Sequence, residues 1–199
     1  MENIFDQLIE SYIKDQVGVS DHILDPTLSK SLQVNLNALY SNSQLKNAGT
    51  GNDDLASINK LIRGDKIFWL DKIHHDQFED AFFLLIDEFV SHLNATCYTG
   101  ITGYEFHYAL YEKGSFYKRH LDQFNTNKDR AFTVIFYLNE NWVVADGGQL
   151  CIHNNDTMQI IAPLNGRCVF FKSSELEHEV LLTEKPRLSI TGWLKTNSA

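Results

Sequence analysis

The chain has 199 residues, of which 43% are hydrophobic and 12% aromatic, and its 17 Lys and Arg against 26 Asp and Glu give a net charge of −9. This composition is typical of one packed globular unit and argues against a disordered chain. Because no basic cluster offsets the acidic balance, we expect no nucleic-acid partner, and no run of about 18 apolar residues predicts a membrane span.

The N-terminal segment and the cysteines bear on the cellular compartment. Residues 1–14, MENIFDQLIESYIK, combine acidic side chains with an amphipathic period, unlike a secretory signal. Cys97, Cys151 and Cys168 are an odd number without CxxC spacing, which disfavours both a disulfide framework and a zinc site. We therefore expect a cytoplasmic protein whose cysteines are unpaired, small and buried.

Helices are expected first along the chain. Residues 3–16 place apolar side chains at helical spacing and predict a helix that ends near Gly18. A short strand is expected over residues 19–24. The pair Asp25-Pro26 is typical of an N-cap followed by proline at the first helical position, and it predicts a second helix over residues 26–40.

A polar segment follows the second helix. Residues 41–54, SNSQLKNAGTGNDD, predict a long loop that is either functional or merely exposed to solvent. Residues 62–70 then predict a strand and residues 76–95 a third helix. We interpret His74-His75-Asp76 as two surface histidines and an N-cap, because residues two apart on a helix diverge by about 200°.

After Gly100 every segment is short, rich in β-branched and aromatic residues, and bounded by turn signals. Eight strands without intervening helices predict an antiparallel sandwich or barrel. The expected fold class is α+β, with supporting N-terminal elements in residues 1–99 and a β core in residues 100–196 of one globular unit. The expected strands cover residues 104–111, 116–122, 131–138, 149–153, 158–161, 167–171, 178–182 and 187–194.

One predicted strand ends in a pattern suited to a metal ion. In YEKGSFYKRHLD, His120 and Asp122 are two residues apart, so on an extended segment both side chains point to the same face. An imidazole and a carboxylate supply two positions of the 2-His-1-carboxylate triad of iron(II) enzymes. By itself, however, this pair is more readily interpreted as a structural contact than as a metal site.

A third ligand is needed, and His178 on a late strand is the main candidate. His153, which follows the Gly147-Gly148 turn, is the competing one. If residues 183–186 form a hairpin turn, Arg187 lies opposite His178 and projects into the barrel. A guanidinium there requires an anionic partner such as a ligand carboxylate. The alternative is a rim position for Arg187, paired with Glu184 or Glu179.

Taken together, these residues resemble the iron(II)- and 2-oxoglutarate-dependent oxygenases, and within them the prolyl 4-hydroxylases of the hypoxia-inducible-factor type and their bacterial relatives. The resemblance rests on His120-x-Asp122, His178 and Arg187, with the segments TVIFYLNENW, VFFKSSELEHEV and RLSITGW. It extends over residues 62–195. It implies a double-stranded β-helix (jelly roll) core that binds Fe(II), 2-oxoglutarate and O2, with ascorbate as a possible reductant.

The resemblance also implies roles for single residues. His120, Asp122 and His178 would bind iron, and Arg187 would bind the distal carboxylate of 2-oxoglutarate. The remaining co-substrate and catalytic positions implied in this way are Tyr137, which would contact the same carboxylate, Tyr111 in the pocket wall, Thr191 as a pocket hydroxyl, and Trp193 near the iron. Ordinary core packing is the alternative for both tyrosines.

For the substrate, the resemblance implies Arg63, Asp65 and Arg130. Asp65 and Arg130 match an acid and a base that pair when a mobile loop closes over a peptide. The segment that leads from Asp122 to Arg130 is one residue shorter than in the animal enzymes, which leaves the register of this pair open.

The implied reaction couples oxidative decarboxylation of 2-oxoglutarate, with release of succinate and CO2, to hydroxylation at C4 of a prolyl residue. Bacterial relatives imply a protein partner, elongation factor Tu. Two alternatives stay open: hydroxylation of a free amino acid or other small molecule, and a cupin-like protein that senses oxygen or iron without turnover. A small-molecule enzyme needs no peptide groove, and a sensor needs no Arg187.

Overall fold

The computed structural model describes residues 4–49, 61–123, 128–154 and 157–196, and the helices come early in this part of the chain. They are α1 (Asp6–Asp15), α2 (Pro26–Ser41) and α3 (Gln77–Cys97), with 3-10 turns η1 (Lys72–His74) and η2 (Val144–Asp146). The carboxylate of Asp25 accepts hydrogen bonds from the first amides of α2, and Asp76 does the same for α3. Both predicted N-caps are confirmed, because each carboxylate satisfies amides that a helix start leaves unpaired.

The strands form two sheets, and every pair within them is antiparallel. The larger sheet has the order β1 (Val17–Ser20), β9 (Cys168–Lys172), β6 (Arg130–Tyr137), β11 (Arg187–Lys195), β4 (Gly103–Tyr111), β3 (Asp65–Trp69) and β2 (Lys46–Asn47). The smaller sheet has the order β5 (Tyr117–His120), β10 (Glu177–Val180), β7 (Leu150–Asn154) and β8 (Thr157–Ile161).

The eight strands expected after Gly100 are all present, and two other expectations need correction. The strand predicted over residues 19–24 forms earlier, because α1 ends at Gln16 in the left-handed conformation and the chain enters β1 at once. The long loop predicted over residues 41–54 contains β2, which pairs with β3. The part of that loop from residue 50 onward lies outside the described residues.

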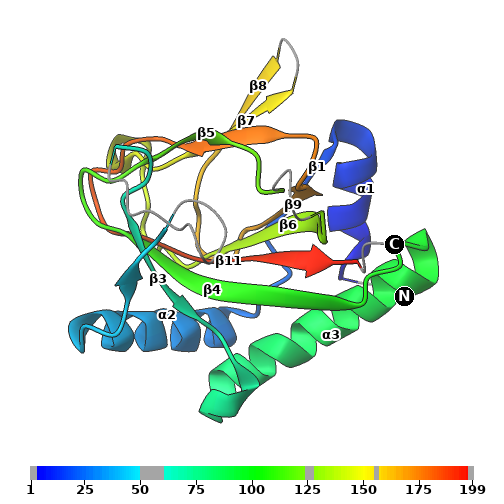
Figure 1. Ribbon diagram of the computed structural model, residues 1–199, viewed down its shortest axis with the longest axis horizontal. Coiled ribbons are helices and arrows are strands. Elements are labelled where there is room, and N and C mark those ends of the chain that lie inside the picture. Colours follow the sequence, from blue (N-terminus) through cyan, green and yellow to red (C-terminus); the bar gives the residue numbers. More distant parts are fainter. Residues whose placement is uncertain (1–3, 50–60, 124–127, 155–156, 197–199) are drawn as a thin grey trace.

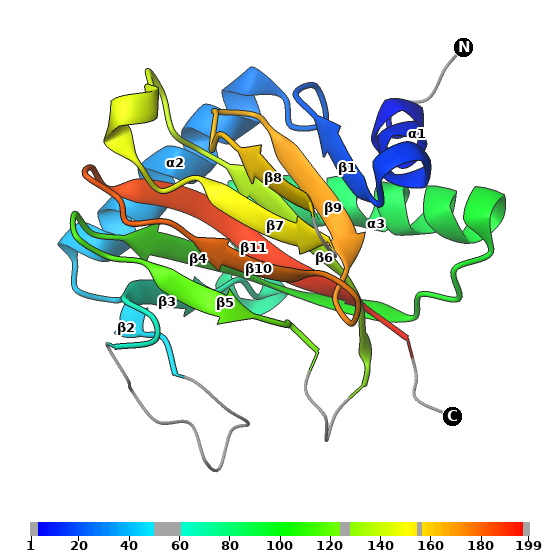
Figure 2. The ribbon, with the colours of Figure 1, turned by 90° about the horizontal axis from the view of Figure 1, so that it is seen from above.

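The outer face of the larger sheet is covered by the three helices (Figure 2). This face carries every second side chain of the central strands, among them Phe106 on β4 and Phe136 on β6. Both rings meet Phe82 of α3 edge-on, with centroids 5.2 and 5.3 Å from it. Because Phe82 is fully buried, its replacement by Ala would cost about 3–5 kcal/mol of folding free energy.

The inner face of the larger sheet looks toward the smaller sheet (Figure 1). A second apolar cluster fills part of this space, with Ile135 and Phe171 on one side and Leu150 and Ile152 on the other. Alternation places Arg187, Ser189, Thr191 and Trp193 of β11 on the same inner side. Polar side chains therefore face a cavity that shares the space between the sheets with this apolar cluster.

Two expectations from composition can be compared with the described residues. All three cysteines are unpaired; Cys151 and Cys168 are buried, but Cys97, at the end of α3, is exposed. Burial was predicted for all three, and the prediction is wrong for Cys97, the last residue of α3, because its position at the helix end leaves it exposed. Of the helices that the structure describes, none combines the length and the apolar character needed to span a membrane.

Candidate active site

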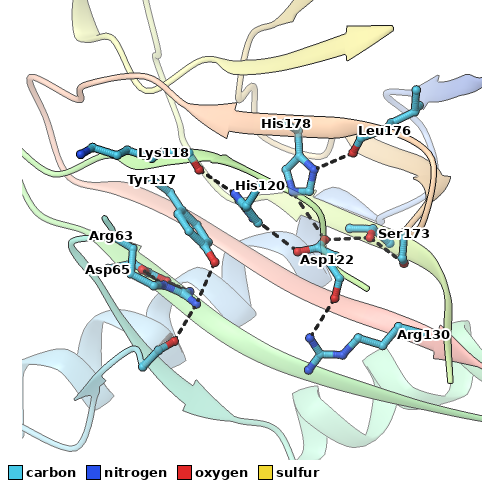
Figure 3. Close-up of polar contacts among 12 residues, drawn as sticks. Arg63, Asp65, Tyr117, Lys118, His120, Asp122, Arg130, Ser173, Leu176 and His178 are labelled. Atoms are coloured by element: carbon cyan, nitrogen blue, oxygen red, sulfur yellow. Dashed lines mark hydrogen bonds and ion pairs between the residues drawn. The ribbon is translucent and has the colours of Figure 1, made fainter. Parts of the chain in front are cut away.

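Two histidines and one aspartate converge on the inner side of the smaller sheet (Figure 3). His120 ends β5 and lies directly opposite His178 on β10. Asp122 was expected on this strand, but it lies just past the end of β5. Its carboxylate oxygens are nevertheless 3.4 Å from His120 Nε2 and 3.5 Å from His178 Nε2. The three ligand atoms all lie within 4.8 Å of one another.

Backbone carbonyls fix which nitrogen each imidazole presents to this site. His120 Nδ1 is 2.7 Å from the carbonyl oxygen of Lys118, and His178 Nδ1 is 3.2 Å from that of Leu176. A carbonyl oxygen can only accept, so each Nδ1 carries the proton and each Nε2 keeps its lone pair. Metal-ligating histidines are typically oriented by a hydrogen bond of this kind.

The carboxylate of Asp122 is held ready in its charged form. Burial alone would raise its pKa, but the two imidazoles and a hydrogen bond from Thr133 hold the pKa of Asp122 well below its ordinary value. Thr133 Oγ1 donates to Asp122 Oδ2 at 2.8 Å and lies 2.9 Å from Ser173 Oγ. Burial lowers the pKa of His178 to about 4, so its ring is neutral at physiological pH.

These properties suit a divalent metal ion. The donor set is two neutral imidazole nitrogens and one anionic oxygen, which is the combination that binds iron(II) and leaves further coordination positions open. A lone pair must be free on each ligand at neutral pH, and the tautomers and ionisation states above provide it. The site therefore fits Fe(II) by its chemistry.

Arg187 is buried with no carboxylate beside it. Its side chain is 3% exposed, its Nε donates to the carbonyl of Gly148 at 2.8 Å, and Nη1 is 3.4 Å from Ser189 Oγ. The guanidinium carbon lies 4.9 Å from the ring centres of both Tyr111 and Tyr137. Among the described residues no carboxylate forms an ion pair with it, so the charge is free to bind an anionic ligand.

Arg187 reaches this position by a different route from the one expected. The segment after β10 is a crossover between sheets rather than a hairpin, because β11 pairs with β4 and β6 while β10 pairs with β5 and β7. The partner directly opposite Arg187 is thus Tyr111, not His178. The predicted hairpin is wrong, although Arg187 still faces the space between the sheets.

The two alternatives for these residues do not hold. Glu184 pairs with Lys113 at 3.3 Å and Glu179 with His153 at 2.9 Å, so neither acid neutralises Arg187. His153 alternates with the inward-facing Ile152 on β7 and points away from the metal-binding cluster. It is therefore not the third member of that cluster.

The Gly147-Gly148 pair brings the backbone close to Arg187. Both glycines have positive φ, +67° and +71°, and a Cβ at Gly148 would lie 3.0 Å from Arg187 Cδ. The amide of Gly148 also donates to the carbonyl of Leu182 at 3.0 Å. A residue without Cβ is needed here, because the same turn must approach Arg187 and offer it a carbonyl.

A cavity of about 540 Å³ joins the metal-binding cluster to Arg187. Its walls include Tyr111, Thr191 and Trp193, which the sequence had singled out. Tyr137 is behind the wall, and its hydroxyl is buried without a hydrogen-bond partner in the described structure. Burial raises the pKa of both Tyr111 and Tyr137, so each hydroxyl stays protonated and can donate to an anion.

The acid and base expected to pair across the substrate opening have other partners. Arg63 binds both carboxylate oxygens of Asp65, at 2.7 and 2.6 Å. Arg130 binds Glu105 at 2.8 Å and stacks on Trp193, with its guanidinium carbon 3.4 Å from the ring centre. In this structure Asp65 and Arg130 form no ion pair with each other, because each has a nearer opposite charge. All of these side chains line the same cavity.

Other lining residues were not anticipated. Among them are Glu105 and His107 on β4 and Tyr117 on β5. Tyr117 stacks on His120 with ring centroids 3.6 Å apart. The guanidinium carbon of Arg63 lies over the ring of Tyr117, 4.3 Å from its centre. A signal did exist, since strict alternation along β4 places Glu105 and His107 on the same face as Tyr111.

Comparison with known proteins agrees with this geometry. Residues 106–195 match the family model described as 2OG-Fe(II) oxygenase superfamily. A Hypoxia-inducible factor prolyl hydroxylase of Caenorhabditis elegans is 34% identical over 151 residues, which are 70% of this chain and 20% of that protein. The chain therefore spans about a fifth of the length of this curated relative.

Two solved structures are similar over nearly the whole chain. A prolyl-4-hydroxylase from Pseudomonas putida is 30% identical, with a TM-score of 0.87 over 98% of this chain and 100% of that one. A Trichoplax adhaerens prolyl hydroxylase, in complex with a peptide fragment of the hypoxia-inducible factor oxygen degradation domain, is 27% identical. Its TM-score is 0.82 over 96% of this chain and 88% of that one.

Proposed function

The chain belongs to the 2OG-Fe(II) oxygenase superfamily, and from this membership we propose that it hydroxylates C4 of a prolyl residue in a protein substrate. The likeness to two prolyl hydroxylases supports the choice of residue, and the complex of one of them with a peptide supports a polypeptide substrate. We also propose that the two facing sheets form a double-stranded β-helix, with residues 1–99 supporting a catalytic core in residues 100–196.

In this proposal His120, Asp122 and His178 hold Fe(II). The bound metal supplies the oxidative chemistry, in which 2-oxoglutarate is decarboxylated to succinate and CO2 at the expense of O2. The protein's own contribution is to keep both Nε2 lone pairs and the Asp122 carboxylate available. Thr133 holds that carboxylate in place, and the apolar cluster between the two sheets limits access of water to the cavity.

Arg187 carries the assignment of 2-oxoglutarate as co-substrate. A buried guanidinium without a carboxylate is costly unless an anion binds it, and a terminal carboxylate can accept two parallel hydrogen bonds from its planar fork. Tyr111 and Tyr137 flank the guanidinium and can donate to the same carboxylate. Thr191 lies four residues along β11 from Arg187 and lines the same cavity.

For the protein substrate we propose a prolyl residue in elongation factor Tu. Arg63, Asp65 and Arg130 line the cavity beside Trp193 and would contact the segment around that proline. Such a partner agrees with the expected cytoplasmic location.

The experiment is mass spectrometry of a defined reaction. The protein is incubated without air with Fe(II), 2-oxoglutarate and purified elongation factor Tu, with and without ascorbate, and air is then admitted. We expect a gain of one oxygen atom on a prolyl residue, together with succinate, and a higher yield over repeated turnovers when ascorbate is present. Succinate formation with every prolyl residue unmodified would contradict the substrate but not the co-substrate.

The two other functions make different demands on the cavity. A hydroxylase of a free amino acid needs a second anion-binding group near the metal, and there the described arginines are already paired with Asp65 and Glu105. A sensor of oxygen or iron needs no buried cation at all. Arg187 is thus the observation that favours turnover, and the paired arginines favour a peptide.

A further inference from the structure

His107 is a buried histidine that nothing so far accounts for. It lies on β4, is 4% exposed and lines the cavity on the side away from Arg187. Its register partners are Trp69 on β3 and Thr191 on β11. The rings of Trp69 and Trp193 approach it at centroid distances of 5.0 and 5.4 Å, so the imidazole forms the centre of an aromatic wall.

The two ring nitrogens of His107 have unequal surroundings. Nδ1 is enclosed and has no hydrogen-bond partner in the described structure, whereas Nε2 is not enclosed and has no protein partner either. A neutral imidazole has one N–H, and a buried N–H without an acceptor costs about 1–3 kcal/mol. The proton is therefore better placed on Nε2, where a ligand in the cavity can accept it.

His107 stays neutral at physiological pH, which makes it a hydrogen-bond donor rather than a cation. Burial above all, together with the charges of Arg63 and Arg130, lowers its pKa to about 4, although Asp65 and Asp122 act in the opposite direction. The nearby carboxylates of Asp65 and Glu105 already accept from the two arginines. The acceptor for His107 must come from the ligand.

The position along β4 shows which ligand this is. His107 is four residues from Tyr111, the partner of Arg187, and strand geometry places the two rows about 13 Å apart. The cations near His107, Arg63 and Arg130, are already paired with Asp65 and Glu105, so this row offers no free cation to the second carboxylate of a diacid anchored at Arg187. The group beside His107 is therefore the substrate and not the co-substrate.

We propose that His107 donates a hydrogen bond from Nε2 to a main-chain carbonyl next to the target proline, while Trp69 and Trp193 pack against the pyrrolidine ring and its neighbour. A prolyl residue lacks an amide N–H, so the chain around it offers acceptors in excess of donors, and a wall that donates suits it. This inference rests on the proposed function and deepens it, since it makes His107 a residue that selects a polypeptide.

The test compares His107→Phe, which keeps a ring but removes the donor, with His107→Asn, which keeps a donor. The probe is the peptide of elongation factor Tu that contains the prolyl residue oxidised by the unmodified enzyme. We expect His107→Phe to raise the peptide KM about 10-fold, equivalent to about 1.4 kcal/mol, and to change the 2-oxoglutarate KM and peptide-independent succinate formation by a smaller factor. His107→Asn should recover part of the affinity.

Thioamide peptides show whether the lost partner is a carbonyl. Two peptides are compared, each with one of the carbonyls next to the proline replaced by the weakly accepting C=S. One of the two replacements should raise the peptide KM of the unmodified enzyme, and the same replacement should have no effect on the KM of His107→Phe. His153→Phe, a change outside the cavity, is the control and should match the unmodified enzyme in KM. Thermal unfolding of each variant checks that the fold is intact.

The outcomes separate the two claims. A normal peptide KM in folded His107→Phe, or equal loss of peptide-independent turnover, would overturn the role of His107 and leave the proposed function standing. Equal thioamide effects in both enzymes would also overturn it. If the unmodified enzyme oxidised no prolyl peptide at all, the proposed function would fail, and this inference would fail with it.

Discussion

The arginines at the two ends of the cavity differ in whether a carboxylate neutralises them. Toward the opening, Arg63 and Arg130 each pair with a carboxylate, Asp65 and Glu105, and their side chains are 15% and 18% exposed. At the other end, Arg187 is almost fully buried, and among the described residues its hydrogen-bond partners are a carbonyl and a hydroxyl rather than a carboxylate. The more costly charge to bury is thus the one that lacks a counterion.

This difference separates an anion-binding site from a surface that positions a neutral chain. An unpaired buried guanidinium is stable only if a ligand supplies the negative charge, so the end at Arg187 selects a carboxylate. The paired arginines are already neutralised, so the open end has hydrogen bonds and aromatic surface to offer instead. A diacid co-substrate and a peptide substrate suit these two ends respectively, with the metal-binding cluster between them.

The largest expected effect comes from removing the cluster that joins the two ends. His178→Ala should lose iron(II) binding and 2-oxoglutarate turnover, by more than the roughly 10- to 100-fold that loss of an outer hydrogen bond causes. The measurement is iron content after dialysis together with succinate formation. His153→Ala, which removes a histidine paired with Glu179 outside the cavity, should retain both. Substantial succinate formation by His178→Ala would show that His178 is not a ligand.

The contrast between arginines can be tested by the same conservative change at each end. Arg187→Lys keeps the charge but loses the planar fork, so we expect the 2-oxoglutarate KM to rise about 30- to 100-fold with iron binding intact. Arg63→Lys should alter the peptide KM and leave the 2-oxoglutarate KM nearly unchanged. Steady-state kinetics with each substrate varied in turn separates the two. Equal effects on the 2-oxoglutarate KM would abolish the distinction between the ends.

Acid unfolding tests the neutral state of His107 at the open end. Because its folded pKa of about 4 lies below the ordinary 6.5, the unfolded chain binds the extra proton first, and stability falls as pH drops through this window. Between pH 7 and 5 this single group should cost about 2 kcal/mol of unfolding free energy. Urea unfolding of His107→Phe should show a correspondingly smaller loss between these two values. An unchanged loss would mean that His107 is accessible to protons in the folded protein.

The smallest effect concerns the turn that supports Arg187. Gly148→Ala places a Cβ 3.0 Å from Arg187 Cδ, so the side chain must shift and the 2-oxoglutarate KM should rise about 5-fold, or about 1 kcal/mol. Gly114→Ala is a matched control, since Gly114 has φ +83° and a Cβ there meets nothing within 4 Å. Both variants should lose about 1 kcal/mol of stability from backbone strain, measured by urea unfolding. A normal KM in Gly148→Ala would show that this turn does not position Arg187.

Much of the fold follows from local patterns in the sequence. Helix starts were predictable at Asp25 and Asp76 because an N-cap acts within three residues of itself. The eight late strands were predictable from short apolar and aromatic segments between turns. Strand pairing was not, because a turn such as residues 183–186 does not encode which sheet the next strand joins. That choice depends on β4 and β6, far away in the sequence.

The site shows the same division between local and non-local information. The convergence of His120 and Asp122 was predictable from their spacing. Although β5 ends at His120, the two side chains stay close, because residues two apart at a strand end remain neighbours. Arg63, Asp65 and Arg130 were singled out, but the way they pair was not. Arg130 was expected to pair with Asp65, and Glu105 on another strand binds it instead. His107 and Glu105 could have been found by extending the alternation along β4 from Tyr111.

The most direct test of the whole account is a reaction under isotopically labelled dioxygen. The unmodified protein and Arg187→Lys are each supplied with Fe(II), 2-oxoglutarate and the elongation factor Tu peptide, and peptide and succinate are measured by mass spectrometry. We predict one labelled oxygen atom on the prolyl residue, a matching amount of succinate, and the loss of both in Arg187→Lys at low 2-oxoglutarate. Labelled succinate without a labelled prolyl residue, or full activity in Arg187→Lys, would contradict the account.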